Sequence, residues 1–148
     1  MKTKLILLLI SITVAFSSCK KDDSVTDTRD KYVGKWIGTQ TVKFTDSGST
    51  DSFPVTYQIT KGTVNNQIKF TDSDDASIIL TAYVDNTTHV YDKYTQTDNS
   101  SGTLIYMEQT GTGSISGNTI TDSGNLLLQM DGYNYYGTWT QKLTKAAK

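Results

Sequence analysis

The chain has 148 residues, of which 36% are hydrophobic and 20% charged, and its formal net charge is −1 at pH 7. A balance this close to neutral excludes the clustered basic face of a nucleic-acid-binding protein and purely electrostatic adhesion to anionic lipid. A chain of this length forms one domain with its own core, and its single cysteine leaves no internal disulfide to stabilise that core.

The first predicted element is a hydrophobic leader at residues 1–18. It contains Lys2 and Lys4, a predominantly apolar run at residues 5–16, and small residues before Cys19. As a helix that run would span about 18 Å, which is short of the roughly 30 Å hydrocarbon core of a bilayer. The layout is typical of a secretory signal peptide that is removed after export.

Cys19 lies at the expected cleavage point, and this position resembles the lipobox of bacterial lipoproteins. Phe16 occupies a position where that family usually has leucine. The resemblance implies that the Cys19 thiol is acylated, that Cys19 is the first mature residue, and that the acyl chains hold the protein on the outer membrane. The alternative is a free thiol after ordinary signal cleavage.

Residues 19–30 are expected to form the acylated cysteine and a flexible tether. Residues 20–23 read Lys-Lys-Asp-Asp, which resembles the surface-export signal of Bacteroidetes lipoproteins, although a solvated charged tether explains them equally well. The periplasmic face of the outer membrane and the cell surface therefore both stay open as locations. Residues 31–148 are expected to form a single β-barrel domain.

The rest of the chain predicts strands, because threonine and tyrosine are abundant and Glu108 is the only glutamate. Apolar and polar residues alternate with a period of two at residues 32–44, 53–60, 67–71, 78–84, 104–109 and 133–143. The apolar faces of five of these runs comprise Tyr32, Trp36, Val42 and Phe44; Phe53, Val55, Tyr57 and Ile59; Ile68 and Phe70; Ile78, Leu80, Ala82 and Val84; and Tyr133, Tyr135, Trp139 and Leu143. In residues 104–109, Leu104, Tyr106 and Glu108 alternate with Ile105, Met107 and Gln109.

Clusters of Asp, Asn, Ser and Gly between these runs predict turns. They lie at residues 46–52, 65–66, 72–75, 85–86, 98–102, 116–118, 122–124 and 131–132, and Pro54 is expected at a strand start or on an edge. Short connections place strands that are consecutive in the sequence beside one another in the sheet. The fold class is therefore all-β, with an antiparallel up-and-down barrel of about eight strands, which removes exposed edges. A two-sheet β-sandwich is the alternative.

Gly34-Lys35-Trp36 on the first strand resembles the Gly-x-Trp signature of lipocalin-like (calycin) barrels. Together with residues 111–118 and the final strand containing Trp139, the pattern resembles the small lipocalin-like lipoproteins of Bacteroidetes. The resemblance implies that Trp36 closes the barrel floor beneath a basic side chain of the last strand, for which Lys142 is the expected residue. The alternative for Trp36 is an ordinary core aromatic.

No motif of catalysis or metal binding is recognisable. His89 is the only histidine, so a zinc site lacks ligands, and we expect His89 to be a half-exposed strand residue. Residues 72–75 lack the further ligands of a calcium loop, residues 113–117 have no serine at the nucleophile position, and Asp92 with Glu108 lacks the spacing of a glycosidase pair. We therefore expect no cofactor, no metal and no enzymatic activity.

Two hypotheses for function follow from the predicted barrel. An eight-stranded barrel is just wide enough to hold one small ligand, so the first is the binding of a small apolar or amphipathic molecule. Its candidate lining residues are Trp36, Tyr57, Ile78, Leu80, Tyr106, Leu128, Tyr135 and Trp139. The second is a monomeric interaction module that presents a tyrosine-rich sheet face, with Tyr133 and Tyr136, to a glycan or a partner protein.

Overall fold

The computed structural model describes residues 26–99 and 103–147, and these contain nine strands and no helix. The strands are β1 (Gly34–Phe44), β2 (Thr50–Lys61), β3 (Gln67–Asp72), β4 (Ile79–Asp85), β5 (Thr88–Tyr91), β6 (Tyr94–Asp98), β7 (Ile105–Ser116), β8 (Thr119–Met130) and β9 (Tyr133–Lys145). No helix capable of crossing a bilayer occurs in this described part of the chain.

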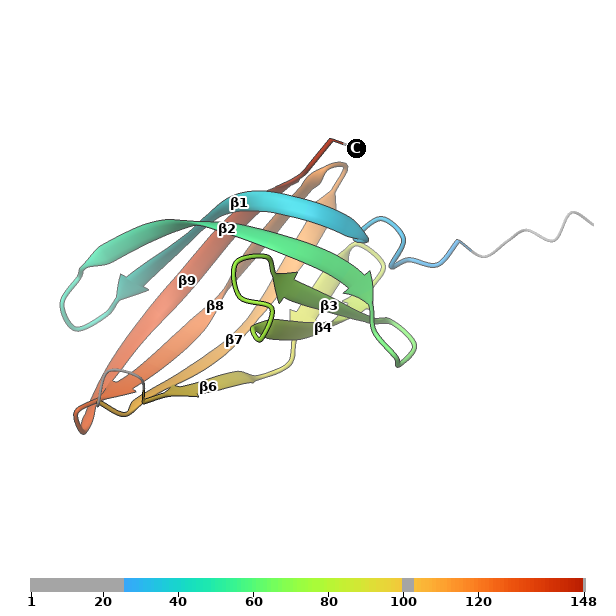
Figure 1. Ribbon diagram of the computed structural model, residues 1–148. Helices are drawn as coiled ribbons and strands as arrows, with labels where there is room; N and C mark the ends of the chain where they lie inside the picture. Colours follow the sequence, from blue (N-terminus) through green and yellow to red (C-terminus); the bar gives the residue numbers. More distant parts are fainter. Residues whose placement is uncertain (1–25, 100–102, 148) are drawn as a thin grey trace, which may run out of the picture.

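Eight of the strands close into an antiparallel barrel, and β6 is an additional strand (Figure 1). Strands that are consecutive in the sequence pair with each other, except β5 and β6. In addition β1 pairs with β9, and β5 pairs with β7 to complete the ring. This confirms the predicted up-and-down barrel and excludes the two-sheet sandwich. The closed ring is consistent with the lipocalin-like architecture that the residues around Trp36 implied.

The barrel has one closed end and one open end, and β7 pairs with a different strand toward each end on the same side. Residues 112–114 of β7 pair with β5 within the ring, whereas residues 105–109 pair with the additional strand β6. The long strands β1, β2, β7, β8 and β9 extend past the short β3 and β4 and form the wall of the open end (Figure 1).

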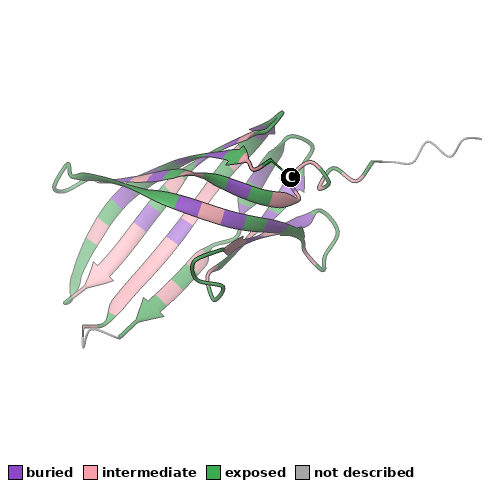
Figure 2. Ribbon diagram, turned by 45° about the horizontal axis from the view of Figure 1, so that its top comes forward, coloured by how far each residue is buried: buried purple, intermediate pink, exposed green. Residues whose placement is uncertain are grey.

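The core fills the closed half of the barrel. Its fully buried members are Tyr32, Trp36, Ile59, Ile68, Phe70, Ala82, Ile120 and Leu143. Figure 2 shows buried and exposed residues alternating along β1 and β2, and half-buried residues along the outer halves of β7 and β8. The predicted inward faces of β1 to β4 and β9 are confirmed, although Phe53 and Tyr133 lie toward the open end and remain exposed.

The predicted turns are largely confirmed. Asp131 and Gly132 both have positive φ, 53° and 80°, as the two-residue hairpin between β8 and β9 requires. Pro54 lies in the part of β2 that pairs with β1 alone, so its missing N–H breaks no ladder. The turn predicted at residues 98–102 falls partly outside the described residues.

The turn predicted at residues 122–124 is wrong, because these residues lie inside β8. The inward positions there are Asp122, which is buried, and Gly124, which lies beside Trp139. A Cβ at Gly124 would come within 2.7 Å of Trp139 Nε1, and one at Gly111 within 2.4 Å of the Trp139 ring. The local Asp-Ser-Gly signal for a turn is overridden because the interior needs small residues around a tryptophan.

A packed turn at residues 27–33 covers the closed end. Arg29 and Lys61 both pair with Asp27, at 2.7 and 2.9 Å, and Lys61 also pairs with Asp30 at 2.6 Å. The boundary expected after residue 30 falls inside this turn, which already contacts the barrel before the fully buried Tyr32. The leader and Cys19 lie outside the described residues.

Candidate ligand cavity at the open end

The open half of the barrel contains an inner cavity of about 200 Å³. Its walls come from β1 and β2 on one side, from β6, β7 and β8 on the other, and from β3, β4 and the connection between them. The lining residues are Gln40, Val42, Phe53, Pro54, Val55, Tyr57, Asp72, Ile78, Leu80, Tyr94, Gln96, Met107, Gln109 and Leu126.

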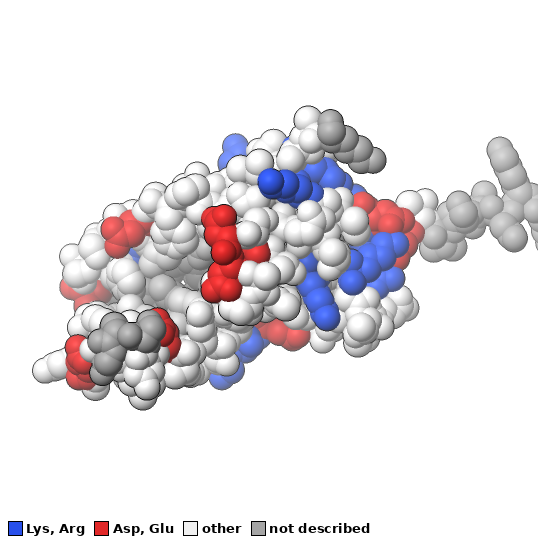
Figure 3. Space-filling view, in the orientation of Figure 1, with Lys and Arg blue, Asp and Glu red and all other residues white. Residues whose placement is uncertain are grey.

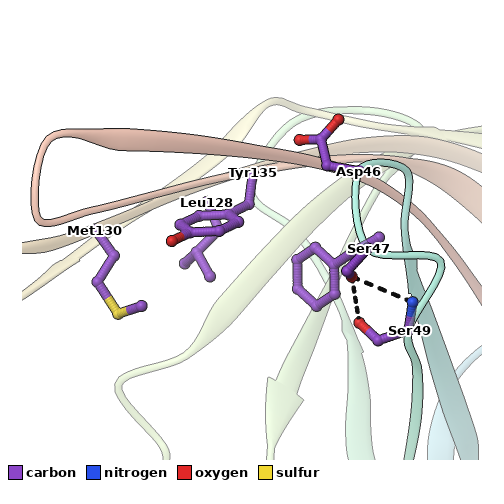
Figure 4. Close-up of a pocket in the computed structure, with 7 residues that line it drawn as sticks. Asp46, Ser47, Ser49, Leu128, Met130 and Tyr135 are labelled. Atoms are coloured by element: carbon purple, nitrogen blue, oxygen red, sulfur yellow. Dashed lines mark hydrogen bonds between the residues drawn. The ribbon is translucent and has the colours of Figure 1, made fainter.

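A second hollow of about 440 Å³, here called the mouth groove, lies between the β1–β2 turn and the β8–β9 hairpin. Its lining residues are Phe44, Asp46, Ser47, Ser49, Leu128, Met130 and Tyr135. Figure 4 shows Leu128, Met130 and Tyr135 on one side of the groove and the β1–β2 turn on the other. The Ser47 and Ser49 hydroxyls lie 2.7 Å apart and brace that turn.

Strand geometry connects the two spaces along the inner wall. Side chains on one face of a strand are two residues apart. Val42 and Leu126 line the inner cavity, and Phe44 and Leu128 are the next inward residues of the same strands and line the mouth groove. On β9, which lies between β1 and β8, Gly137 pairs with both Phe44 and Leu126. The inner wall therefore has no side chain at that position.

Buried polar side chains are mixed with the apolar lining of the inner cavity. Gln40 and Gln109 are 8% and 9% exposed, and among the described residues neither side-chain amide has a hydrogen-bond partner. The Tyr57 hydroxyl also has none, and burial raises the pKa of Tyr57, with a smaller contribution from Asp72. The phenol is therefore neutral at physiological pH and can both donate and accept a hydrogen bond.

The charged residues that line the two spaces are both acidic. They are Asp72 in the inner cavity and Asp46 in the mouth groove, and neither lining includes Lys, Arg or His. Figure 3 shows acidic side chains around the open end and Lys and Arg side chains concentrated toward the closed end. The charged side chains that line the two spaces are therefore of one sign only.

Trp139 separates the cavity from the filled half of the barrel. Its indole N–H donates to the Thr110 carbonyl oxygen at 2.9 Å, and the side chain is 1% exposed. The ring lies against Gly111 and Gly124, where any larger residue would overlap it. Trp139 therefore belongs to the core beneath the cavity and not to the lining.

A buried polar network lies in the filled half of the barrel. Asp122 Oδ2 accepts hydrogen bonds from the Tyr91 hydroxyl at 2.8 Å and from Gln141 Nε2 at 2.5 Å. His89 Nε2 lies 3.0 Å from Asp122 Oδ1, without hydrogen-bond alignment. Burial, followed by the nearby Asp122 carboxylate, raises the pKa of Tyr91 well above its usual value.

The expectation of a half-exposed His89 is wrong, since its side chain is 1% exposed. Gly113 pairs with His89 across the β5–β7 ladder, and a Cβ there would lie 2.6 Å from the imidazole. The missing side chain makes room for the ring inside the barrel. None of the four network residues lines the cavity or the groove.

The closed end contains the tryptophan and cation that the sequence resemblance implied, but the lysine is a different one. Trp36 Nε1 donates to the Tyr32 carbonyl oxygen at 2.6 Å, and Lys145 Nζ lies 5.3 Å from the centroid of the Trp36 ring. Lys142 is exposed, because it alternates with the inward residues Gln141 and Leu143.

The other predicted lining residues divide into three groups. Tyr57, Ile78 and Leu80 line the inner cavity, and Leu128 and Tyr135 line the mouth groove. Trp36 and Trp139 are core residues.

Tyr106, also predicted as a lining residue, lines neither the inner cavity nor the mouth groove. Its hydroxyl donates to Glu108 Oε2 at 3.0 Å, and its ring lines a separate surface hollow near the β8–β9 hairpin. The inward residues of β7 at this level are Met107 and Gln109.

Sequence reasoning missed Gln109 and Gln40 because a glutamine within an alternating run is assigned by default to the solvent face. For Gln109 a signal was available, since it shares a face with Ile105 and Met107.

No group of three or more His, Cys, Asp or Glu side chains within residues 26–99 and 103–147 is arranged to hold a metal ion.

No protein-family model matches the chain, and no curated protein matches it in sequence. One similar solved structure is a protein of unknown function from the DUF3598 family of Nostoc punctiforme PCC 73102, with a TM-score of 0.46 and 12% sequence identity. The match covers 78% of this chain and 48% of that protein, so this chain spans about half of its length.

Proposed function

We propose that the protein is a lipid-anchored, non-catalytic binding protein whose barrel takes up a small amphipathic molecule through its open end. The observation that carries this proposal is the inner cavity, beside which the next inward residues of β1 and β8 line the mouth groove. The closed half of the barrel is tightly filled and the open half is hollow, so the packed core forms a rigid floor beneath the binding space. Small-molecule sites are concave and mostly apolar, with a few polar groups that orient the ligand.

The proposed anchor is consistent with the position of the closed end. The described chain begins beside the 62–66 turn, where Arg29 Nη1 donates to the Val64 carbonyl oxygen at 3.1 Å. A lipid attached at Cys19 would then hold the closed end toward the outer membrane and leave the open end facing away. The periplasmic face and the cell surface are both compatible with that orientation.

The test is to fill the mouth groove. Leu128→Trp adds bulk to the groove, and Leu127→Trp adds the same bulk on the adjacent residue, which faces outward. A chain from residue 20 onward contains every described strand and can be titrated with an apolar fluorescent probe. We expect Leu128→Trp to weaken probe binding about tenfold or more, because a blocked pocket loses most of its contact area, and Leu127→Trp to bind as the wild type does. A wild-type barrel that binds no apolar probe contradicts the proposal.

A second candidate function is supported by the surface near the β8–β9 hairpin. Tyr133 and Tyr136 are 68% and 53% exposed, and Leu104 is 64% exposed. Exposed aromatic rings suit stacking on a glycan or contact with a partner protein. The hollow barrel favours the first candidate, and the groove-filling variant separates the two because it leaves these tyrosines unchanged.

A further inference from the structure

Three buried polar side chains from three strands line the inner cavity. They are Gln40 on β1, Tyr57 on β2 and Gln109 on β7, and each is more than nine-tenths buried. Among the described residues none of the three has a side-chain hydrogen-bond partner. Their polar atoms are not among the fully enclosed atoms without a partner, so they reach the space of the cavity, where a bound molecule can pair with them.

The hydrogen-bonding capacity of these groups selects the kind of head group. A glutamine amide and a tyrosine hydroxyl each offer both a donor and an acceptor. A head group of the amide or hydroxyl class also offers both and can pair with all three. A carboxylate at neutral pH accepts only, so it would leave the carbonyl oxygens of Gln40 and Gln109 without a donor.

The charges around the cavity exclude an anionic head group. Asp72 in the cavity and Asp46 in the groove are acidic, and no cationic residue lines either space to balance a bound anion. Asp72 Oδ1 accepts the backbone N–H groups of Asp74 at 2.7 Å and Asp75 at 3.3 Å, which hold this carboxylate against the β3–β4 connection. The three unpartnered groups of the cavity are themselves uncharged, so an uncharged head group matches them best.

The order of polar and apolar surfaces sets the orientation of the ligand. The unpartnered polar groups lie in the inner cavity, whereas Phe44, Leu128, Met130 and Tyr135 make the mouth groove largely apolar. We infer, building on the proposed function, that the ligand is an uncharged amphiphile that enters head first. Its amide or hydroxyl head pairs with Gln40, Tyr57 and Gln109, and its apolar tail lies in the mouth groove.

The test compares two head groups of the same shape. A saturated primary fatty amide and the fatty acid of equal chain length differ in charge and in donors, and either can displace a bound fluorescent probe from the chain that starts at residue 20. At neutral pH, below the aggregation concentration of both compounds, we expect the amide to bind about tenfold more tightly than the acid.

Glutamine variants test which residues make the distinction. In Gln40→Leu and Gln109→Leu the preference for the amide should fall about fivefold each, as expected for a single lost hydrogen bond. Gln58→Leu is the matched control, because Gln58 is exposed on the outer face of β2, and it should leave the preference unchanged. Replacing an unpartnered buried amide by an apolar group of similar size is not expected to unfold the barrel, and a thermal melt checks this.

The outcomes separate this inference from the proposed function. If the acid binds as tightly as the amide, or if both glutamine variants keep the full preference, the head-group inference is wrong while the binding function stands. If neither amphiphile nor the apolar probe binds the wild-type barrel, the proposed function itself fails.

Discussion

Asp122 holds together the polar residues inside the closed half of the barrel. It receives hydrogen bonds from Tyr91 on β5 and Gln141 on β9, so one carboxylate joins strands far apart in the sequence. Tyr91 also packs edge-on against His89 and Trp139, with ring centroids 5.1 and 5.7 Å away. The Tyr91 hydroxyl is thus kept neutral by burial and by the adjacent carboxylate.

This environment makes stability depend on alkaline pH. An unfolded tyrosine ionises near pH 10, whereas burial and Asp122 raise the pKa of folded Tyr91 well above that value. Above about pH 10 the unfolded chain therefore binds fewer protons than the folded chain, and the stability that is complete below this pH is lost as the pH rises. Burial raises the pKa of Tyr32 and Tyr57 as well, so they act in the same direction.

We expect Tyr91→Phe to reduce the dependence of the unfolding free energy on pH above about pH 10. One proton accounts for at most about 1.4 kcal/mol per pH unit, and this is the largest change in slope that the variant can produce. Urea denaturation at a series of alkaline pH values measures the slope. The same slope in the variant and the wild type would show that Tyr91 is not protected from ionisation by the fold.

At the scale of the strands, β7 and β8 are long and unbroken, and several of their inward-facing positions are glycines. Gly111 and Gly124 pair with each other and both lie against the Trp139 ring, and Gly113 lies beside His89 and Asp122. The two strands pair along their whole length, from Ile105 with Met130 to Ser116 with Thr119. Glycine here serves close packing inside a barrel, although in a strand it costs backbone entropy.

Gly124→Ala should therefore destabilise the barrel although the added group is a single methyl. The new Cβ would overlap the Thr110 carbonyl oxygen and approach Trp139 Nε1. Overpacking of this kind costs about 1–3 kcal/mol. Ser123→Ala, on the neighbouring exposed position, is the control and should change stability little. Chemical denaturation followed by tryptophan fluorescence reports both, and equal midpoints for the glycine variant and the wild type would contradict the packing argument.

At the scale of the whole molecule, the two ends of the barrel differ in structure and in charge. The closed end is sealed by Tyr32, Trp36 and the Lys145 cation, and Lys145 Nζ also donates to the Lys31 carbonyl oxygen at 2.9 Å. The open end has acidic side chains at its entrance (Figure 3), and its strands enclose the inner cavity and the mouth groove. The described chain starts at the closed end, which is opposite the end that contains the proposed binding site.

The anchor is tested in the full-length chain. In a Gram-negative host, we expect the wild type to incorporate radiolabelled palmitate and to sediment with membranes, and Cys19→Ser to lose both properties, because acyl chains on that thiol supply the membrane affinity. Equal labelling of the variant, or full-length wild type released into the medium, would refute acylation at this residue. The result does not depend on ligand binding, which is measured on the chain without the leader.

The sequence determined the features that depend on neighbouring residues. Period-two alternation identified the strands and the inward faces of residues 53–59 and 78–84, and Asp131-Gly132 identified a hairpin turn. Each of these rests on interactions within a few residues, and a single sequence records them directly. Short connections then led to the antiparallel barrel.

Only the tertiary structure decided how residues from separate strands meet. Asp122 was assigned to a turn because its neighbours are Ser and Gly, and its partners Tyr91 and Gln141 lie 31 and 19 residues away. Register placed Lys145 instead of Lys142 over the floor tryptophan, and the β6–β7 pairing left Gln109 facing a hollow. The reason is physical: alternation tells on which side of a strand a residue lies, but the closure and register of the barrel determine what it meets there.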